Sequence, residues 1–257
     1  MLPFFFGSGQ RRLFGIYETA AGKAAVGAAL LCNSWGTEYG SAHRAMRLLS
    51  KRLRAVGFDT LRFDYFGAGD SGGETVDAHL DGWREDISTA LKELKDMSGK
   101  PRLIIIGLRL GATLVAQSAQ RLSVKADGVV LWDPILDGAS YLDIFLDQQH
   151  CQNEGSSFIE SISPGIALTS ELGGLLVSNA FVDELKSIDL FSSKVTIPAN
   201  VLTIFTENQH RGFEIGCSPD SRSEVAILRA PSPWKESTEQ EERLPVEVFD
   251  RILKWLR

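Results

Sequence analysis

Cysteine, long apolar runs and positive charge are all scarce in this chain of 257 residues. Its three cysteines, Cys32, Cys151 and Cys217, are too few and too scattered for a disulfide framework or a zinc site, so we expect reduced thiols. No stretch reaches the ~18 apolar residues that a membrane-spanning helix requires. The formal net charge of -6, without a cluster of Lys and Arg, argues against a nucleic-acid-binding groove. These absences predict a globular protein with neither nucleic-acid nor membrane partners.

Histidine is equally rare, because the chain has four and none follows His210. Their spacing is not that of metal ligands, so we expect no metal and no other cofactor. Residues 1–7 contain three phenylalanines, but they lack a leading positive region and their apolar run is short. We therefore expect a cytoplasmic protein rather than an exported one. Assembly as a homodimer stays open.

The chain is organised around residues 103–113, where a β-branched run is followed by Gly-x-Arg-x-Gly and a series of small residues. This order predicts a strand, a sharp turn and a helix, as in the nucleophile elbow whose Gly-x-Ser-x-Gly presents a serine. Gly107 and Gly111 fit a turn that has no room for a Cβ. The central residue is Arg109, whose guanidinium stays protonated and cannot attack a carbonyl. The pattern thus predicts the local fold without its usual chemistry.

Apolar strand patterns and amphipathic helix patterns alternate on both sides of this segment. Such alternation is typical of a parallel sheet covered by helices on both faces. Residues 4–6 and 13–17 are expected to form a hairpin at its edge. The further strands are expected at 26–32, 58–64, 103–108 and 129–132. The helices are expected at 41–56 with Ser41 as its cap, at 81–97, and from the elbow to about residue 122.

The alternation stops at residue 138 and resumes at about residue 196. The intervening segment is expected to be helical and loop-like, with a flexible point at Gly173 and Gly174. We interpret residues 138–195 as a cap inserted over the strand ends. Residues 1–137 and 196–257 then form the core, with further strands at 200–206 and 225–228 and a closing helix at 246–256.

Residues 63–72 read Phe-Asp-Tyr-Phe-Gly-Ala-Gly-Asp-Ser-Gly. They resemble the Asp-x-x-Gly-x-Gly-x-Ser segment of serine-aminopeptidase-like and esterase-like members of the α/β-hydrolase superfamily. Together with the elbow, this resemblance implies the α/β-hydrolase fold over nearly the whole chain, and a structural role for Ser71. Residues 33–44, 107–113 and 131–134 are most similar to a subgroup, the exosortase-associated hydrolase-like proteins.

The resemblance implies a catalytic triad in the order Ser, acid, His. The nucleophile position holds Arg109, and Asp133 or Glu207 stands where the acid is expected. The histidine is expected after the last strand, near residues 230–234, where none occurs and where Trp234 would fill its space. A conventional acyl-enzyme mechanism is therefore not expected.

The oxyanion hole survives this comparison better than the triad. In the superfamily it is formed by the backbone N–H after the nucleophile and by a loop that follows an early strand. Leu110 provides the first position here, and Ser34 or Trp35 lies in the second. Ser34 is also a candidate displaced nucleophile, although no base is identified for it.

Two interpretations of Arg109 stay open. It pairs with a buried acid to stabilise the fold, or it binds a carboxylate or phosphate beside N–H donors at a helix N-terminus. In either case a buried guanidinium requires an anionic partner within contact distance. The candidates are Glu38, Asp133 and Glu207, in that order.

Glu38 and His43 are expected at the mouth of the site. As a pair they would act as a base and its orienting residue for an attacking water. In the alternative, which we favour, Glu38 is ion-paired to Arg44 or Arg109 and His43 lies on the helix surface.

Aromatic residues fall in the loops that line the pocket of this fold, among them Trp35, Tyr39 and Trp234, and indicate an apolar ligand chamber. We therefore expect a protein that binds an acyl or carboxylate-bearing small molecule. It would process this ligand by hydrolysis or by cyclisation or group transfer, without a serine nucleophile. Two alternatives stay open: a non-catalytic pseudoenzyme that serves as a binding or partner subunit, and an esterase or thioesterase with relocated catalytic residues. An open chamber at Arg109 and Glu38 favours an enzyme or receptor, whereas a plugged one favours a scaffold.

Overall fold

The computed structural model describes residues 1–22, 25–152, 169–193, 195–206, 213–235 and 244–257, without the side chains of 146–152. Two short pairs of strands, β7 (Thr169–Leu172) with β8 (Leu175–Ser178) and β9 (Thr196–Ile197) with β11 (Gly216–Cys217), lie outside the main sheet. The strands of the main sheet are β1 (Leu2–Gly7), β2 (Arg12–Glu18), β3 (Gly27–Cys32), β4 (Phe58–Phe63), β5 (Leu103–Leu108), β6 (Gly128–Trp132), β10 (Asn200–Phe205) and β12 (Ser223–Ile227). The helices are α1 (Thr37–Ala55), the 3₁₀ helix η1 (Thr75–Asp77), α2 (Leu80–Ser98), α3 (Leu110–Ser118), α4 (Gly138–Gln152), α5 (Asn179–Lys186) and α6 (Val246–Trp255).

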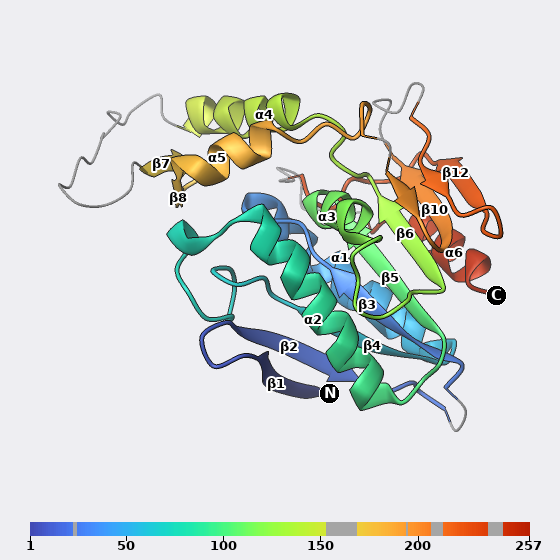
Figure 1. Cartoon of the computed structure of the whole chain (residues 1–257). Helices are drawn as coiled ribbons and strands as arrows, with labels where there is room; N and C mark the ends of the chain where they lie inside the picture. Colours follow the sequence, from blue (N-terminus) through green and yellow to red (C-terminus); the bar gives the residue numbers. More distant parts are fainter. Residues whose placement is uncertain (23–24, 153–168, 194, 207–212, 236–243) are drawn as a thin grey trace.

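The eight main strands form one sheet in the order β1-β2-β4-β3-β5-β6-β10-β12. The β1–β2 hairpin is antiparallel, as is the pairing of β2 with β4, and the remaining pairs are parallel. Helices α1 and α6 pack on one face, and α2 and α3 pack on the other (Figure 1). The predicted α/β-hydrolase fold with a mostly parallel sheet is confirmed.

The parallel strands bring their carboxyl ends to one edge of the sheet, where ligands bind in open α/β folds. Cys32 at the end of β3 lies opposite Gly107 of β5, so the loop after β3 runs beside the turn after β5. The described parts of segment 138–195, which are α4, the β7–β8 hairpin and α5, lie at this same edge (Figure 1).

Several predicted boundaries are wrong. Helix α1 begins at Thr37, one turn earlier than the expected cap at Ser41, because Gly36 takes φ 66° and starts the helix there. Helix α3 ends at Ser118 rather than near Leu122, and short turns follow it.

Within segment 138–195, residues 173 and 174, expected as a flexible point, form a defined turn. Gly173 and Gly174 have φ values of 57° and 77° and form the two-residue turn of the β7–β8 hairpin. Positive φ at both central residues is the requirement of a tight hairpin turn, which glycine meets without strain. The segment therefore contains a strand pair that the sequence pattern did not predict.

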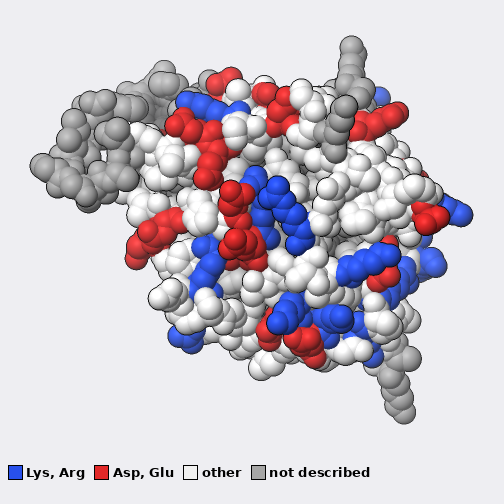
Figure 2. Space-filling view, in the orientation of Figure 1, with Lys and Arg blue, Asp and Glu red and all other residues white. Residues whose placement is uncertain are grey.

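The viewed surface carries Lys and Arg interspersed with Asp and Glu (Figure 2). Within the described ranges, no helix combines the length and apolarity that crossing a membrane needs.

Candidate functional site

The turn between β5 and α3 has the geometry that its sequence predicts. Arg109 adopts φ 54° and ψ −122°, a conformation that is rare for any residue other than glycine. A Cβ on Gly107 would collide with the backbone of Ala112, and one on Gly111 would collide with the Asn33 carbonyl. Both glycines are therefore required, and the backbone of the β3 loop lies directly against the start of α3.

The Arg109 side chain is buried and is contacted by a carboxylate and two aromatic rings. Only 6% of it is exposed, and its Nε donates a hydrogen bond to Glu38 Oε1 at 2.9 Å. Tyr141 Oη donates to the other carboxylate oxygen at 3.0 Å. The guanidinium lies 5.0 Å from the ring centroid of Trp234 and 5.6 Å from that of Tyr141. We call Arg109, Glu38, Tyr141 and Trp234 the elbow cluster.

The expected anionic partner of Arg109 is therefore present, and it is Glu38, the first of the three candidates. Burial alone would lower the pKa of Arg109, but Glu38 first, with Tyr141 and Asp133, together outweigh it and the pKa is raised. This ion pair, with aromatic rings on its sides, matches the interpretation in which the arginine stabilises the fold. Trp234 stands in the segment where the resemblance implies a histidine, and its ring lies 5.0 Å from the Arg109 guanidinium and 6.2 Å from the Trp132 ring.

The other expected acid, Asp133, holds two strand ends together. Its Oδ1 accepts a hydrogen bond from the Thr206 backbone N–H at 2.9 Å, and its Oδ2 accepts one from the Thr206 hydroxyl at 2.7 Å. These bonds join the end of β6 to the end of β10. Glu207 and His210, the remaining candidates in this region, lie outside the described residues.

The structure does not bring Glu38 and His43 together as a base and its orienting residue. Because α1 begins at Thr37, Glu38 lies in its first turn and is buried against Arg109. His43 is exposed on the same helix, with its ring 6.2 Å from that of Tyr39. The favoured alternative, an ion-paired Glu38 and a surface His43, describes this arrangement.

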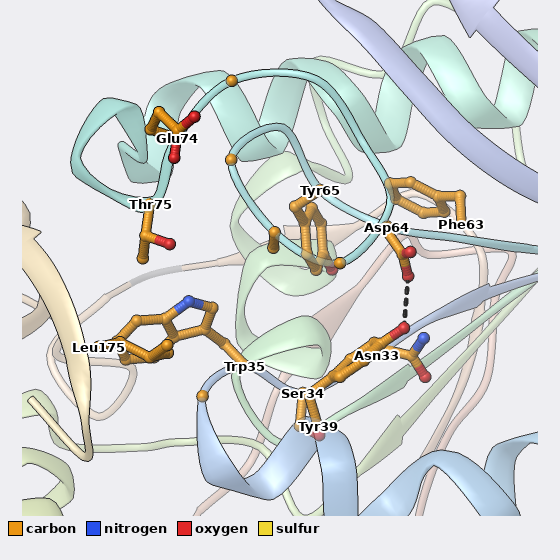
Figure 3. A pocket seen from close by; sticks show the side chains of 15 residues that line it. Asn33, Ser34, Trp35, Tyr39, Phe63, Asp64, Tyr65, Glu74, Thr75 and Leu175 are labelled. Atoms are coloured by element: carbon orange, nitrogen blue, oxygen red, sulfur yellow. Dashed lines mark hydrogen bonds between the residues drawn. The ribbon is translucent and has the colours of Figure 1, made fainter.

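A cavity of about 290 Å³ lies at the carboxyl ends of β3 and β4 (Figure 3). Its wall includes neither Arg109 nor Glu38. Residues 33–36 form one side, lining residues from the segment 64–75 form another, and Leu175 of β8 also contributes to the wall. The polar and aromatic side chains that line it include Asn33, Ser34, Trp35, Tyr39, Asp64 and Tyr65.

Several polar groups in this wall lack the partners that buried groups normally have. Ser34 is 1% exposed, and its hydroxyl has no hydrogen-bond partner among the described residues. The hydroxyl of Tyr65 is also unpartnered there, and burial first and the neighbouring Cys32 thiol second raise its pKa well above the usual range. Most buried polar groups are hydrogen-bonded, so exceptions in a cavity wall indicate a place for a ligand or water.

Asp64 is the buried carboxylate of this wall. Its Oδ1 accepts a hydrogen bond from Tyr39 Oη at 2.7 Å, and its Oδ2 accepts one from the Asp70 backbone N–H at 3.0 Å. Burial raises the pKa of Asp64, and the bonds from Asp70 and Tyr39 oppose this rise without cancelling it.

The loop that carries Asp64 is held by Ser71. Ser71 Oγ donates to the Asp64 carbonyl at 2.6 Å and accepts from the Phe14 N–H at 2.8 Å. The structural role that the family resemblance implies for Ser71 is confirmed. The loop is thereby tied to strand β2.

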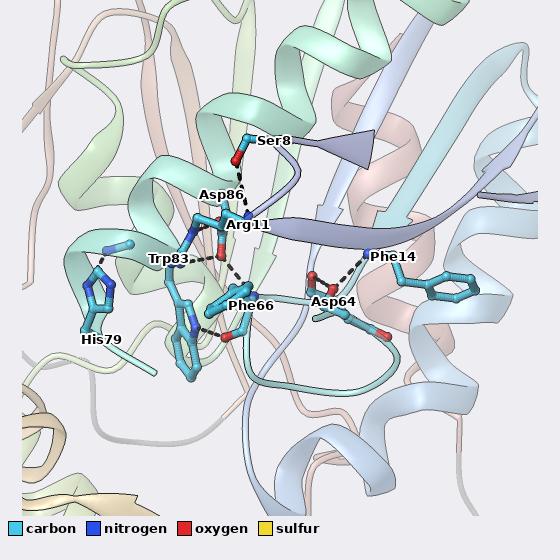
Figure 4. A network of polar contacts seen from close by, with 10 residues as sticks. Ser8, Arg11, Phe14, Asp64, Phe66, His79, Trp83 and Asp86 are labelled. Atoms are coloured by element: carbon cyan, nitrogen blue, oxygen red, sulfur yellow. Dashed lines mark hydrogen bonds and ion pairs between the residues drawn. The ribbon is translucent and has the colours of Figure 1, made fainter. Parts of the chain in front are cut away.

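A second anchor of this loop is the ion pair of Arg11 with Asp86, at 2.6 Å (Figure 4). Asp86 Oδ2 also accepts a hydrogen bond from the Phe66 N–H at 3.0 Å, and Trp83 Nε1 donates to the Phe66 carbonyl at 2.9 Å. The loop beside the cavity is thus fixed to α2 and to the β1–β2 turn.

The predicted site residues divide into two groups in space. Ser34, Trp35 and Tyr39 line the cavity, whereas Arg109, Glu38 and Trp234 form the elbow cluster. Leu110 begins α3, so its N–H has no acceptor within the helix. Sequence reasoning missed Asp64 as a site residue, although it directly follows a buried strand at the edge where sites of this fold gather.

Metal binding finds no support in the described part of the chain, where no three His, Cys, Asp or Glu side chains cluster suitably for a metal ion.

Comparisons with known proteins agree on the fold. The match with Est1E from Butyrivibrio proteoclasticus with bound ferulic acid covers 98% of this chain and 97% of Est1E, at 15% sequence identity and a TM-score of 0.67. The match with an esterase from Pyrococcus furiosus covers 99% of this chain and 90% of the esterase, at 17% identity and a TM-score of 0.63. The match with mouse alpha/beta hydrolase domain-containing protein 10 covers 100% of this chain and 98% of that protein's chain, at 15% identity and a TM-score of 0.56. No curated protein sequence matches the chain significantly.

The sequence profile of the family described as serine aminopeptidase, S33, matches residues 39–201, which is more than half of the chain. This match spans both the Asp64 loop and the turn at Arg109. The chain belongs to the S33 serine aminopeptidase family and has its α/β-hydrolase fold.

Proposed function

We propose that this protein binds a small molecule in the cavity beside Ser34 and Asp64, and that it does not use the turn at Arg109 for acyl-enzyme chemistry. The small-molecule ligand predicted from the sequence is retained, but its site is now beside Ser34 and Asp64 rather than at Arg109. Segment 138–195 is likewise retained as a cap, because Leu175 of β8 contributes to the cavity wall.

One observation carries the proposal: the elbow position is occupied by an enclosed ion pair while a cavity lies next to it. The guanidinium of Arg109 is bound by Glu38 and covered by Trp234, so a ligand reaches neither its charge nor an attacking group there. The cavity, in contrast, has aromatic walls and unpartnered hydroxyls, which are features of small-molecule sites.

The carboxylate-bearing ligand of the sequence interpretation depended on a free Arg109. Since Glu38 binds that arginine, the charged side chains available to a ligand are those of the cavity wall, Asp64 and Glu74. Both repel a carboxylate.

A fluorophosphonate probe tests the chemical half of the proposal, because it labels activated serines in serine hydrolases. We expect no labelling of the wild type, and none of Arg109→Ser, since a serine at this turn would have Trp234 rather than a histidine beside it. An active serine esterase treated in parallel is the control. Stoichiometric labelling of the wild type would show a relocated catalytic serine and overturn the proposal.

Ligand-observed NMR tests the binding half, with small aromatic fragments of positive, negative and zero charge as probes. Ala68 lines the cavity, so we expect Ala68→Phe to fill it and abolish fragment binding. Ala55→Phe is the matched control, because Ala55 is exposed at the far end of α1. Equal binding by both variants would contradict the proposed place of the ligand.

The second candidate is a non-catalytic partner subunit, and the enclosed elbow cluster favours it. It predicts that no fragment binds the wild type, while the fold and the ion pair remain intact. The cavity with its unpartnered Ser34 hydroxyl is the observation that ranks it second.

A further inference from the structure

Three of the buried carboxylates in the described part of this protein are paired with an arginine. Glu38, Asp86 and Glu18 each form such an ion pair, with N–O distances of 2.9, 2.6 and 2.9 Å. Asp64 is 7% exposed, yet within the described ranges no Lys, Arg or His forms an ion pair with it. A buried charge without a counter-ion is costly unless hydrogen bonds or a ligand compensate it.

Asp59 provides an internal comparison. It is also buried without an ion pair in the described part of the chain, and it accepts hydrogen bonds from Tyr17 Oη at 2.8 Å and from the Ala20 N–H at 2.8 Å. Asp64 has the same two kinds of donor, a tyrosine hydroxyl and a backbone N–H. The difference is that Asp64 lines this cavity, whereas Asp59 is not among its lining residues.

The rest of the cavity wall suits a cation better than an anion. Its described lining residues include Asp64 and Glu74 but no Lys, Arg or His. Trp35, Tyr39 and Tyr65 contribute aromatic rings, whose faces attract cations. Ser34 adds a hydroxyl oxygen that has no donor of its own among the described residues.

We propose, on the basis of the proposed function, that the cavity binds a small amine in its protonated form. The ammonium group donates charge-assisted hydrogen bonds to Asp64 and Ser34, and the apolar part of the ligand packs against the aromatic wall. With a volume of about 290 Å³, the cavity takes a compact ligand of one ring rather than a long chain.

Three probes of nearly equal shape test this assignment: benzylamine, benzyl alcohol and benzoate. Isothermal titration calorimetry at neutral pH is expected to show benzylamine binding about tenfold more tightly than benzyl alcohol, as a charge-assisted bond predicts, and benzoate not binding. Benzyl alcohol binding as tightly as benzylamine would overturn the amine assignment and leave the proposed function standing. Absence of binding by all three probes would overturn the amine assignment as well, whereas the proposed function is tested separately by fragment binding to the wild type and to Ala68→Phe.

Paired variants connect the preference to individual side chains. Asp64→Asn is expected to remove the preference for benzylamine over benzyl alcohol, whereas Asp59→Asn keeps it. Ser34→Ala is expected to weaken the binding of benzylamine about fivefold, which is the effect of losing one hydrogen bond. Thr203→Val is its control, since the Thr203 hydroxyl is likewise buried without a partner in the described structure but lies on β10, away from the cavity. A preference that survives Asp64→Asn would contradict the role of Asp64.

Discussion

The elbow cluster and the cavity lie at the same edge of the sheet, and they treat their polar groups in opposite ways. In the elbow cluster the two charges of Arg109 and Glu38 are paired, and Tyr141 donates to the carboxylate. In the cavity wall Ser34 lacks a hydrogen-bond partner and Asp64 lacks a counter-ion among the described residues. The first arrangement stabilises the fold, and the second leaves binding capacity unused.

A single loop separates the two regions. The Asn33 carbonyl packs against Gly111 at the start of α3, while Ser34 and Trp35, the next residues, line the cavity. In this protein the conspicuous motif at Arg109 carries an ion pair, and the cavity is lined by neighbouring loops instead. Unsatisfied buried polar groups indicate a candidate ligand site better than the motif does. Each such group is costly, and proteins keep such groups mainly at functional sites.

The largest expected effect breaks the elbow cluster. Arg109→Ala leaves the Glu38 carboxylate buried without its cation, which is expected to lower the free energy of unfolding by about 3–5 kcal/mol. Arg52→Ala is the control, because Arg52 is 39% exposed and pairs with an exposed Asp250. Its loss is expected to be about 0–1 kcal/mol. Urea unfolding monitored by circular dichroism measures both, and similar losses would contradict a stabilising role of the buried pair.

A smaller effect is expected from the loop that carries Asp64. Ser71→Ala removes two hydrogen bonds, one to the Asp64 carbonyl and one from the Phe14 N–H, and is expected to cost about 1–3 kcal/mol. Because this loop forms part of the cavity wall, fragment binding should weaken too.

Ser88→Ala is the control for this variant. The Ser88 hydroxyl contacts Ser123 at 3.0 Å at the surface of α2, so its removal is expected to change stability within about 0.5 kcal/mol. Ligand-observed NMR and urea unfolding of both variants distinguish them. Unchanged binding in Ser71→Ala would show that the cavity does not depend on this anchor.

Much of the fold could be predicted from local patterns. Continuous apolar runs placed the central strands, and the two glycines around Arg109 indicated the sharp turn that the structure contains. The start of α1 was misplaced because Ser41 is a favoured cap residue, whereas the backbone of Gly36 begins the helix without a side-chain cap. The β7–β8 hairpin was missed because Gly173 and Gly174 fit a flexible linker as well as a tight turn.

The site was predictable only in part. A buried guanidinium needs an anion, so the pairing of Arg109 with Glu38 followed from electrostatics. The missing counter-ion of Asp64 depends on which cations the fold brings near it, and no local pattern contains that information. Asp64 was instead interpreted as part of a structural motif, and its hydrogen bond to the Asp70 N–H agrees with that role as well.

The smallest expected effect concerns the pH dependence of stability. Burial raises the pKa of Asp64, although Tyr39 and His43 of α1 and the Asp70 N–H lower it, and Asp70 and Arg62 also carry charge nearby. The folded protein then holds this proton more tightly than the unfolded chain. Its stability should therefore fall as the pH rises from the ordinary carboxyl range through the raised pKa of Asp64.

Asp64→Asn removes this titration, so the difference in unfolding free energy between variant and wild type should change across that pH window. Urea unfolding at a series of pH values measures it, and a constant difference would contradict a raised pKa. Benzylamine sharpens the comparison, because an ammonium ion binds ionised Asp64 and stabilises the folded state by mass action. Saturating benzylamine should therefore reduce the loss of stability with rising pH in the wild type and leave the pH dependence of Asp64→Asn unchanged.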